Sequence, residues 1–244
     1  MRILVVNPNT TESMTQKIAS SARAAASGGT IVEAVTSEMG PESVEGYYDE
    51  AFAVPGVVRA IAAGEKNGID GAVIACFDDT GLDAARSAVA IPVVGICEAA
   101  LHLAAPLAHR FAIVTTLSRS IPPLEILVMR YGAAARCTVH AAEVAVLALE
   151  ERDGDALARI ERQIQRALAE GRAEAIILGC AGMADLAASL TRKFGVPVID
   201  GVAAAVKLIE ALVGLGLRTS KIGGYAAPLA KAYRGAMSPF APGG

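Results

Sequence analysis

The chain has no tryptophan, and aromatic residues make up only 4% of its 244 residues. Its 22 basic residues are balanced by 25 acidic ones, and no basic tract supports nucleic-acid binding. Neither a GxGxxG fingerprint nor a P-loop pattern occurs, so no nucleotide cofactor is indicated. A nucleophile elbow is also missing, and Ser-His-Asp hydrolysis is therefore not predicted.

None of the four cysteines forms a CxxC pair, and the three histidines share no spacing typical of a metal site or a triad. We expect no metal, no organic cofactor and no secreted disulfide framework; a reducing cytoplasm is the expected compartment. The start of the chain lacks the layout of a signal peptide. The most apolar window, about 88–107, contains two prolines and Glu98, so it predicts strand, loop and helix rather than a membrane span.

What the chain does have is an aliphatic interior, with 53% apolar residues arranged as alternating short β-branched runs and Ala-rich stretches. This alternation predicts an α/β fold with parallel sheets and right-handed crossovers. The expected strands lie near 2–7, 30–36, 70–76, 92–96, 110–115, 137–142, 174–179 and 196–199. The expected helices lie near 10–26, 51–67, 80–89, 98–106, 121–131, 152–170, 183–194 and 202–214.

Two cysteines stand in the same local context in different halves of the chain. Cys76 ends the apolar run that starts at Gly71, and Cys180 ends the run that starts at Glu174. Runs of this kind are typical of buried parallel strands. Each cysteine is therefore expected at the carboxyl end of a strand, where α/β folds place their ligands.

The likeness between the halves continues beyond the cysteines. The motif Ile91-Pro92-Val93-Val94-Gly95 follows Cys76, and Val196-Pro197-Val198-Ile199-Asp200 follows Cys180, at an offset of about 105 residues. We predict two pseudo-symmetric domains, each a parallel sheet flanked by helices, with the active site in the cleft between them. The expected division is 1–97 plus 207–244 for the N-terminal domain and 98–206 for the C-terminal domain.

A pair of thiols in matching positions suggests a chemistry that treats two faces of a substrate alike. Removal of a proton on one face and delivery on the other is such a chemistry. Each cysteine is expected to precede a helix N-terminus, which would favour its thiolate. Cys97 and Cys137 lack this setting and are expected to be structural, and the histidines are expected to be structural or surface residues.

Polar residues at other predicted strand ends are candidates for substrate contact. Asn7 begins the loop Asn7-Pro8-Asn9-Thr10 after the first strand, and Thr115 with Thr116 holds the matching place in the second half. An ordinary turn or strand propensity explains these residues equally well. The polar and aromatic segment 42–50 could close over a ligand or could simply start a helix.

Several motifs together give the chain its family resemblance. They are Asn7-Pro8-Asn9-Thr10, the segment 43–50, Ala75 to Asp79, Val114 to Leu117, Gly179 to Met183 and Asp200 to Val202. With them the chain resembles the aspartate/glutamate racemase superfamily, and most closely its hydantoin racemase branch. The resemblance implies a cofactor-independent racemase, often oligomeric, whose two acid–base residues are Cys76 and Cys180. It further implies substrate contacts from Asn7, Ser43, Phe77, Asp78, Thr115, Thr116, Ala181 and Gly182.

One departure from the superfamily bears on the substrate. Amino-acid racemases usually carry Asn-Thr after the first cysteine and Thr-His after the second, whereas here Phe77-Asp78 and Ala181-Gly182 stand there. The expected substrate is therefore a neutral hydantoin rather than a free amino acid. Allantoin racemase, a decarboxylase or isomerase of the same superfamily, and a non-catalytic small-molecule binding module remain alternatives. No nucleic-acid or membrane partner is expected, and a homo-oligomer is.

Overall fold

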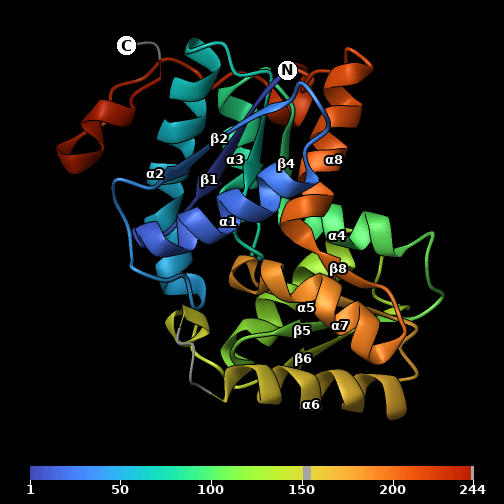
Figure 1. Ribbon diagram of the computed structural model, residues 1–244. Helices are drawn as coiled ribbons and strands as arrows, with labels where there is room; N and C mark the ends of the chain where they lie inside the picture. Colours follow the sequence, from blue (N-terminus) through green and yellow to red (C-terminus); the bar gives the residue numbers. More distant parts are fainter. Residues whose placement is uncertain (151–154, 243–244) are drawn as a thin grey trace.

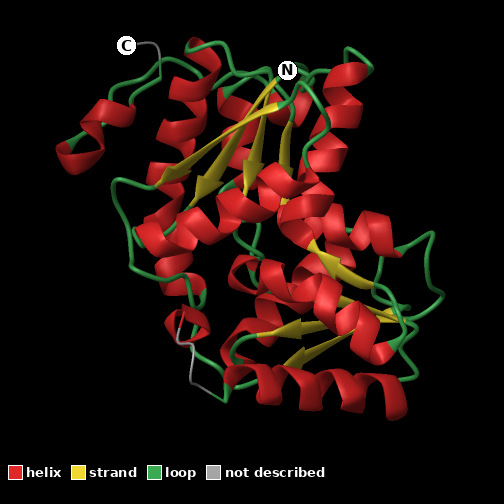
Figure 2. Ribbon diagram, viewed as in Figure 1, coloured by secondary structure: helices red, strands yellow, loops and turns green. Residues whose placement is uncertain are grey.

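The computed structural model describes residues 1–150 and 155–242 and contains two parallel four-stranded sheets with helices packed on their faces (Figures 1 and 2). The first sheet has the strand order β2-β1-β3-β4, and the second has the order β6-β5-β7-β8. The two orders are the same topology repeated. The strands are β1 (Arg2–Asn7), β2 (Ile31–Thr36), β3 (Gly71–Ile74), β4 (Val93–Gly95), β5 (Phe111–Thr115), β6 (Cys137–Ala141), β7 (Ala175–Leu178) and β8 (Val198–Asp200).

The two strands that lead to the cysteines occupy equivalent places. In the first sheet β3 lies beside β1 with Val73 opposite Val5, and in the second β7 lies beside β5 with Ile177 opposite Ile113. All residues of β3 and β7 are buried, because helices cover both faces of a parallel sheet. The predicted α/β fold with two similar halves is confirmed.

The helices also follow the predicted order. They are α1 (Glu12–Ala25), α2 (Tyr47–Lys66), α3 (Leu82–Ala88), α4 (Ile96–Ala104), α5 (Ile121–Arg130), α6 (Ala156–Ala169), α7 (Ala187–Phe194) and α8 (Gly201–Gly214). Residues 152–154 of the predicted helix 152–170 lie outside the described residues. The main difference follows Cys180, where a 3₁₀ segment, Ala181–Leu186, precedes α7.

A continuous apolar core joins the two sheets. It runs from Ile3 and Val73 of the first sheet through residues of α4 and α8 to Ile113 of the second. Helix α8 packs so closely on β3 that a Cβ on Gly71 would lie 2.6 Å from Cγ2 of Ile209. Because the core is continuous, the division at 97/98 and at 207 stays a prediction.

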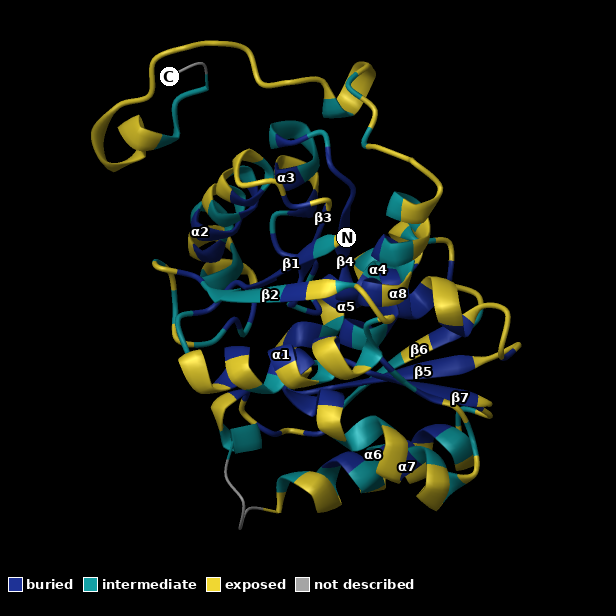
Figure 3. Ribbon diagram, turned by 45° about the horizontal axis from the view of Figure 1, so that its top comes forward, coloured by how far each residue is buried: buried dark blue, intermediate teal, exposed yellow. Residues whose placement is uncertain are grey.

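The chain after α8 returns to the first half and then leaves it. The ammonium group of Lys221 donates to the carbonyls of Arg86 and Ser87, and the Tyr225 hydroxyl donates to Asp83 at 2.9 Å. Beyond Tyr225 the described residues, up to 242, are mostly exposed and arch away from the body (Figure 3). No helix of the described residues is long and apolar enough to cross a membrane.

Candidate active site

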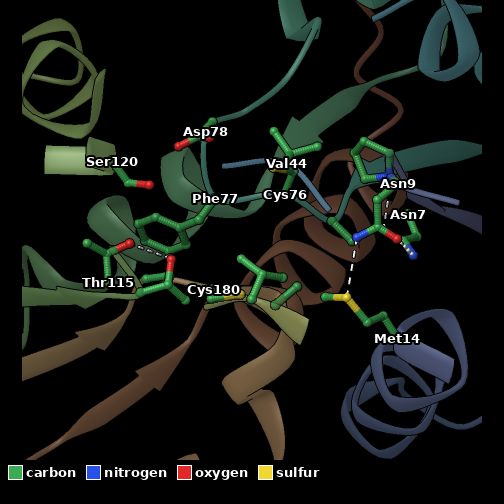
Figure 4. Close-up of a pocket in the computed structure, with 16 residues that line it drawn as sticks. Asn7, Asn9, Met14, Val44, Cys76, Phe77, Asp78, Thr115, Ser120 and Cys180 are labelled. Atoms are coloured by element: carbon green, nitrogen blue, oxygen red, sulfur yellow. Dashed lines mark hydrogen bonds between the residues drawn. The ribbon is translucent and has the colours of Figure 1, made fainter. Parts of the chain in front are cut away.

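A pocket lies between the two halves, where the carboxyl ends of strands from both sheets meet (Figure 4). Its empty space, including the part open to solvent, is about 430 Å³. Both predicted catalytic cysteines line it. The remaining lining residues are Asn7, Pro8, Asn9, Met14, Val44, Ala75, Phe77, Asp78, Thr115, Thr116, Ser120, Val146, Gly179 and Ala181.

The backbone positions Cys76 and Cys180 in the same way. The residue before Cys76, Ala75, donates its N–H to Val6 of β1 at 2.9 Å, and the residue before Cys180, Gly179, donates to Val114 of β5 at 2.8 Å. Each thiol receives the backbone N–H of the residue two positions later, Asp78 for Cys76 and Gly182 for Cys180. Both cysteines are free and partly exposed. The structure thus places two thiols equivalently on one pocket.

The ionisation of these thiols differs from the sequence-based expectation. Burial raises the pKa of Cys180 to about 11, although the Gly182 N–H and the charge of Lys17 partly oppose the shift. Burial, and then the charge of Asp78, raises the pKa of Cys76 well above its ordinary value. The net direction is opposite to the expected one because burial outweighs the backbone N–H that each thiol receives; α3 begins only at Leu82, and a 3₁₀ segment follows Cys180.

Asp78 gives the pocket a carboxyl group with no partner of its own. Its side chain receives no hydrogen bond from the described residues, and burial, followed by the charge of Glu50, raises its pKa to about 7. Its counterpart in the second half is Gly182, where a Cβ would lie 3.0 Å from Cδ1 of Leu149. The carboxyl group therefore breaks the symmetry of the two cysteine loops.

Asn7 lines the pocket, but its side chain is already engaged in the loop. Its amide nitrogen donates to Asn9 Oδ1 at 2.8 Å and to the Thr15 hydroxyl at 3.0 Å. The amide nitrogen of Asn9, in contrast, has only the weak acceptor Met14 Sδ, at 3.4 Å. Asn9 is therefore the residue of this loop whose amide nitrogen is the more available at the pocket; it was not among the predicted contacts, although it belongs to the same motif.

The two threonines after β5 also differ in availability. The Thr115 hydroxyl donates to the Gly179 carbonyl at 3.2 Å, whereas that of Thr116 makes no hydrogen bond with the described residues. Ser120, at the start of α5, presents a second such hydroxyl to the pocket and was missed because nothing in its sequence context marks it. Phe77 and Ala181 also line the pocket, and their apolar side chains form part of its wall.

Two predicted contacts do not line the pocket. Ser43 does not line the pocket, whereas its neighbour Val44 does. Gly182 does not line it either, but its backbone N–H donates to the Cys180 sulfur. Val44 and Val146 of the second half both line the pocket, and their two loops are joined by a hydrogen bond of 2.8 Å from the Val146 N–H to Glu45. Segment 42–46 thus closes one side of the pocket, and α2 begins directly after it at Tyr47.

The other cysteines lie in the protein interior. Cys97 is fully buried in α4, and Cys137 is buried at the start of β6. Within the described residues, no cluster of His, Cys, Asp and Glu side chains could hold a metal ion. The histidines do not line the pocket.

Comparison with known proteins gives a consistent result. Residues 3–209 match the family described as Asp/Glu/Hydantoin racemase. The chain is 49% identical to a hydantoin racemase of Rhizobium meliloti, with 96% of this chain and 98% of that protein covered. It is 46% identical to a hydantoin racemase of Pseudomonas sp. NS671, with 98% and 97% covered. A solved structure of allantoin racemase from Klebsiella pneumoniae is 48% identical, covers 99% of each chain and superposes with a TM-score of 0.96. The chain belongs to the Asp/Glu/hydantoin racemase family and is an isomerase of the racemase class.

Proposed function

We propose that the protein racemises 5-monosubstituted hydantoins by two-base proton transfer at C5, with Cys76 and Cys180 as the two acid–base groups. The observation that carries the proposal is the equivalent placement of two free thiols on one pocket, each held by the backbone N–H two residues later. One thiol on each side of a planar intermediate is what inversion at carbon requires.

The chemistry follows from the substrate and the two sulfurs. The carbonyl at C4 acidifies the C5 hydrogen, one cysteine as thiolate removes it, and the other as thiol protonates the opposite face. The roles exchange for the other enantiomer. Both proton transfers are supplied by the chain, so we propose that no metal or organic cofactor takes part, and activity should persist after exhaustive dialysis against EDTA.

Negative charge develops on the C4 oxygen as the proton leaves C5. The free hydroxyls of Thr116 and Ser120 and the amide of Asn9 are donors that could stabilise it. The carboxylate of Asp78 is an acceptor for a ring N–H. A hydantoin ring presents both kinds of group, so its donors and acceptors can be matched in this pocket.

The same lining argues against a free amino acid as substrate. Among the described residues, no Lys, Arg or His side chain lines the pocket. A free α-carboxylate would therefore lose its hydration beside Asp78 with no cation to compensate. Decarboxylation needs only one proton donor, and binding alone needs no acidic hydrogen donors, so paired thiols favour racemisation over both alternatives.

Allantoin racemase is the second candidate. The 48% identity to the allantoin racemase structure is matched by similar identities to two hydantoin racemases, so overall similarity does not separate them. Polar groups favour the ureido substituent of allantoin, whereas Phe77, Val44 and Val146 favour alkyl or arylalkyl substituents. We therefore propose hydantoins with apolar substituents as the preferred substrates, ahead of allantoin.

The test is to follow the optical rotation of single enantiomers of 5-benzylhydantoin, 5-methylthioethylhydantoin, allantoin, aspartate and glutamate with purified protein. We expect turnover of the alkyl- and arylalkyl-hydantoins and little or none of the amino acids. Efficient racemisation of a free amino acid would overturn the proposal, and a strong preference for allantoin would move it to the second candidate.

We also propose that the protein is a cytoplasmic homo-oligomer. Free thiols persist in a reducing compartment. The segment after Tyr225 carries Leu229 and Met237, which are 80% and 46% exposed, and burial between copies would remove them from water. Light scattering of the full chain, compared with a chain ending at Tyr225, tests the oligomer: a monomer in both cases would contradict it.

A further inference from the structure

The loop that carries Cys76 contains a second carboxyl group, Asp79, which is only 5% exposed and is not among the residues that line the pocket. It accepts hydrogen bonds of 3.0 Å from the backbone N–H groups of Cys97 and Glu98, at the start of α4. Gly95 directly precedes α4, and a Cβ on it would lie 2.1 Å from Asp79 Oδ1. Only glycine at position 95 therefore leaves room for the Asp79 carboxyl group at the start of α4. The carboxyl group therefore fixes the loop to α4.

The third partner of Asp79 comes from the other half of the molecule. The hydroxyl of Tyr131, which directly follows α5, donates to Asp79 Oδ2 at 2.7 Å. Burial raises the pKa of Asp79 to about 7, while the Tyr131 hydroxyl and the two N–H groups favour its charged form. A single carboxyl group thus ties the Cys76 loop to the connection between the halves and to the second half.

The backbone between Cys76 and Asp79 transmits this attachment to the thiol. The Asp79 N–H donates to the Cys76 carbonyl at 3.1 Å and closes a tight turn. Asp79 has a φ of +48°, a left-handed conformation that aspartate tolerates better than most residues. Within this turn lies Asp78, whose N–H meets the Cys76 sulfur. Moving Asp79 would therefore move both the thiol and its donor.

We infer that Asp79 and Tyr131 are positioning residues that hold Cys76, and not Cys180, in place across the pocket. This inference rests on the proposed two-cysteine reaction. The cysteine loop of the second half has its own attachments, through Met183 N–H to the Cys180 carbonyl at 3.1 Å and through Lys17 to the Gly182 carbonyl at 3.4 Å. Loss of the Tyr131 hydroxyl should leave these unchanged.

The test introduces Tyr131→Phe into two backgrounds, Cys180→Ser, which keeps Cys76, and Cys76→Ser, which keeps Cys180. In D2O, NMR measures exchange of the C5 hydrogen of each hydantoin enantiomer. In the background that keeps Cys76, we expect Tyr131→Phe to lower the rate of C5 hydrogen exchange about tenfold. This is the rate change that corresponds to the loss of one hydrogen bond to a charged group. Exchange in the background that keeps Cys180 should change less than about twofold on the same scale.

A second readout does not depend on activity. In the otherwise unmodified protein, Tyr131→Phe should speed iodoacetamide labelling of Cys76 severalfold, because the loosened loop exposes its sulfur, and should leave Cys180 labelling unchanged. Tyr225→Phe is the matched control, since it removes a tyrosine–aspartate hydrogen bond of 2.9 Å at an exposed site of the same half. Asp79→Asn, which also tolerates the left-handed conformation, should give a larger change at Cys76 than Tyr131→Phe.

Equal changes at both cysteines, or none at Cys76, would overturn the inference, because a purely structural role predicts no selectivity. If neither parent background exchanges any hydantoin, the proposed function fails, and the labelling ratio alone then decides the positioning role. Equal effects of Tyr131→Phe and Tyr225→Phe would also overturn it.

Discussion

The two halves of the molecule repeat one topology but give their cysteines different electrostatic surroundings. The Cys76 loop carries a carboxyl side chain at Asp78, and the corresponding place in the Cys180 loop is Gly182, with the Lys17 ammonium group on its carbonyl. Burial raises the pKa of both thiols, and the charge of Asp78 adds to the shift at both. At Cys76 this charge is the largest cause after burial, whereas at Cys180 the Gly182 N–H precedes it and the Lys17 charge also opposes the shift.

The repeated fold and the individual side chains therefore determine different properties of the two cysteines. The repeat supplies the position of each sulfur and one backbone donor for it. The side chains decide how strongly neighbouring charges act on each sulfur. At Cys76 the charge of Asp78 is the largest influence after burial and disfavours the thiolate, whereas at Cys180 the charge of Lys17 favours it.

Removal of either thiol is the strongest test of whether the two cysteines are equally necessary for racemisation. Cys76→Ala and Cys180→Ala should each lower racemisation by at least about 10³-fold, because inversion needs both proton transfers and general acid–base groups contribute on this scale. Optical rotation of a single hydantoin enantiomer measures the loss, and circular dichroism checks that the fold remains. If either variant racemised at a tenth of the wild-type rate, the two-base mechanism would be wrong.

The acidity of the thiols predicts the pH dependence of the reaction. Since both pKa values are raised, with Cys180 at about 11, the thiolate is scarce at neutral pH and its fraction grows as pH rises. Between pH 8 and 9.5, kcat/KM should rise about tenfold per pH unit, as expected below the pKa of an essential base. Protein-free racemisation is subtracted at each pH. A plateau reached by pH 8 would point to a base of much lower pKa.

Selective alkylation sharpens the comparison between the halves. At pH 8.5, iodoacetamide should label Cys180 severalfold faster than Cys76, and both before Cys97 and Cys137, which are buried. Asp78→Asn removes the charge beside Cys76 and should bring the two rates closer together. Peptide mapping after partial labelling measures the ratio. Faster labelling of Cys76 than Cys180 in the wild-type protein would contradict the assigned asymmetry.

The smallest expected effect concerns stability. Burial raises the pKa of Asp78 to about 7, above its unfolded value, so stability that is present below about pH 4 is lost as pH rises toward 7. Asp78→Asn should therefore raise the unfolding midpoint by a few degrees at pH 8 and leave it unchanged at pH 4.

Asp83→Asn is the control with the opposite sign. The hydrogen bond from Arg130 lowers the pKa of Asp83, so this carboxylate stabilises the fold at pH 8 and its replacement should not raise the midpoint. Thermal unfolding at the two pH values measures both variants. A lower midpoint for Asp78→Asn at pH 8 would show that its charge is compensated in the fold.

Much of the architecture could be predicted because apolar β-branched runs and their spacing are local properties of the sequence. The runs ending at Cys76 and Cys180 predicted two equivalent strand ends, and the structure has both on one pocket. The catalytic roles of these cysteines remain predictions.

The finer features of the site depend on contacts between distant residues, which the sequence pattern does not encode. Asn7 and Asn9 both line the pocket, but the amide nitrogen of Asn7 is used within its own loop, whereas that of Asn9 has only the weak acceptor Met14 Sδ. Ser120 and Val146 reach the pocket only through the packing of the second half. The thiol pKa values were expected to be lowered because the sequence suggested helix starts, and burial could not be weighed before the fold was known.

Inversion of a stereocentre moves more than a proton. In the proposed reaction, C5 changes hand between two fixed sulfurs, so the ring can stay in its plane while the substituent moves from one side of that plane to the other. Met14 has an unbranched thioether that adapts to different shapes, and the loops that carry Val44 and Val146 are joined by the hydrogen bond from the Val146 N–H to Glu45. If the proposed mechanism holds, we expect the two strand ends to stay fixed while the wall beside them adapts to the movement of the substituent, so that both mirror images are accepted.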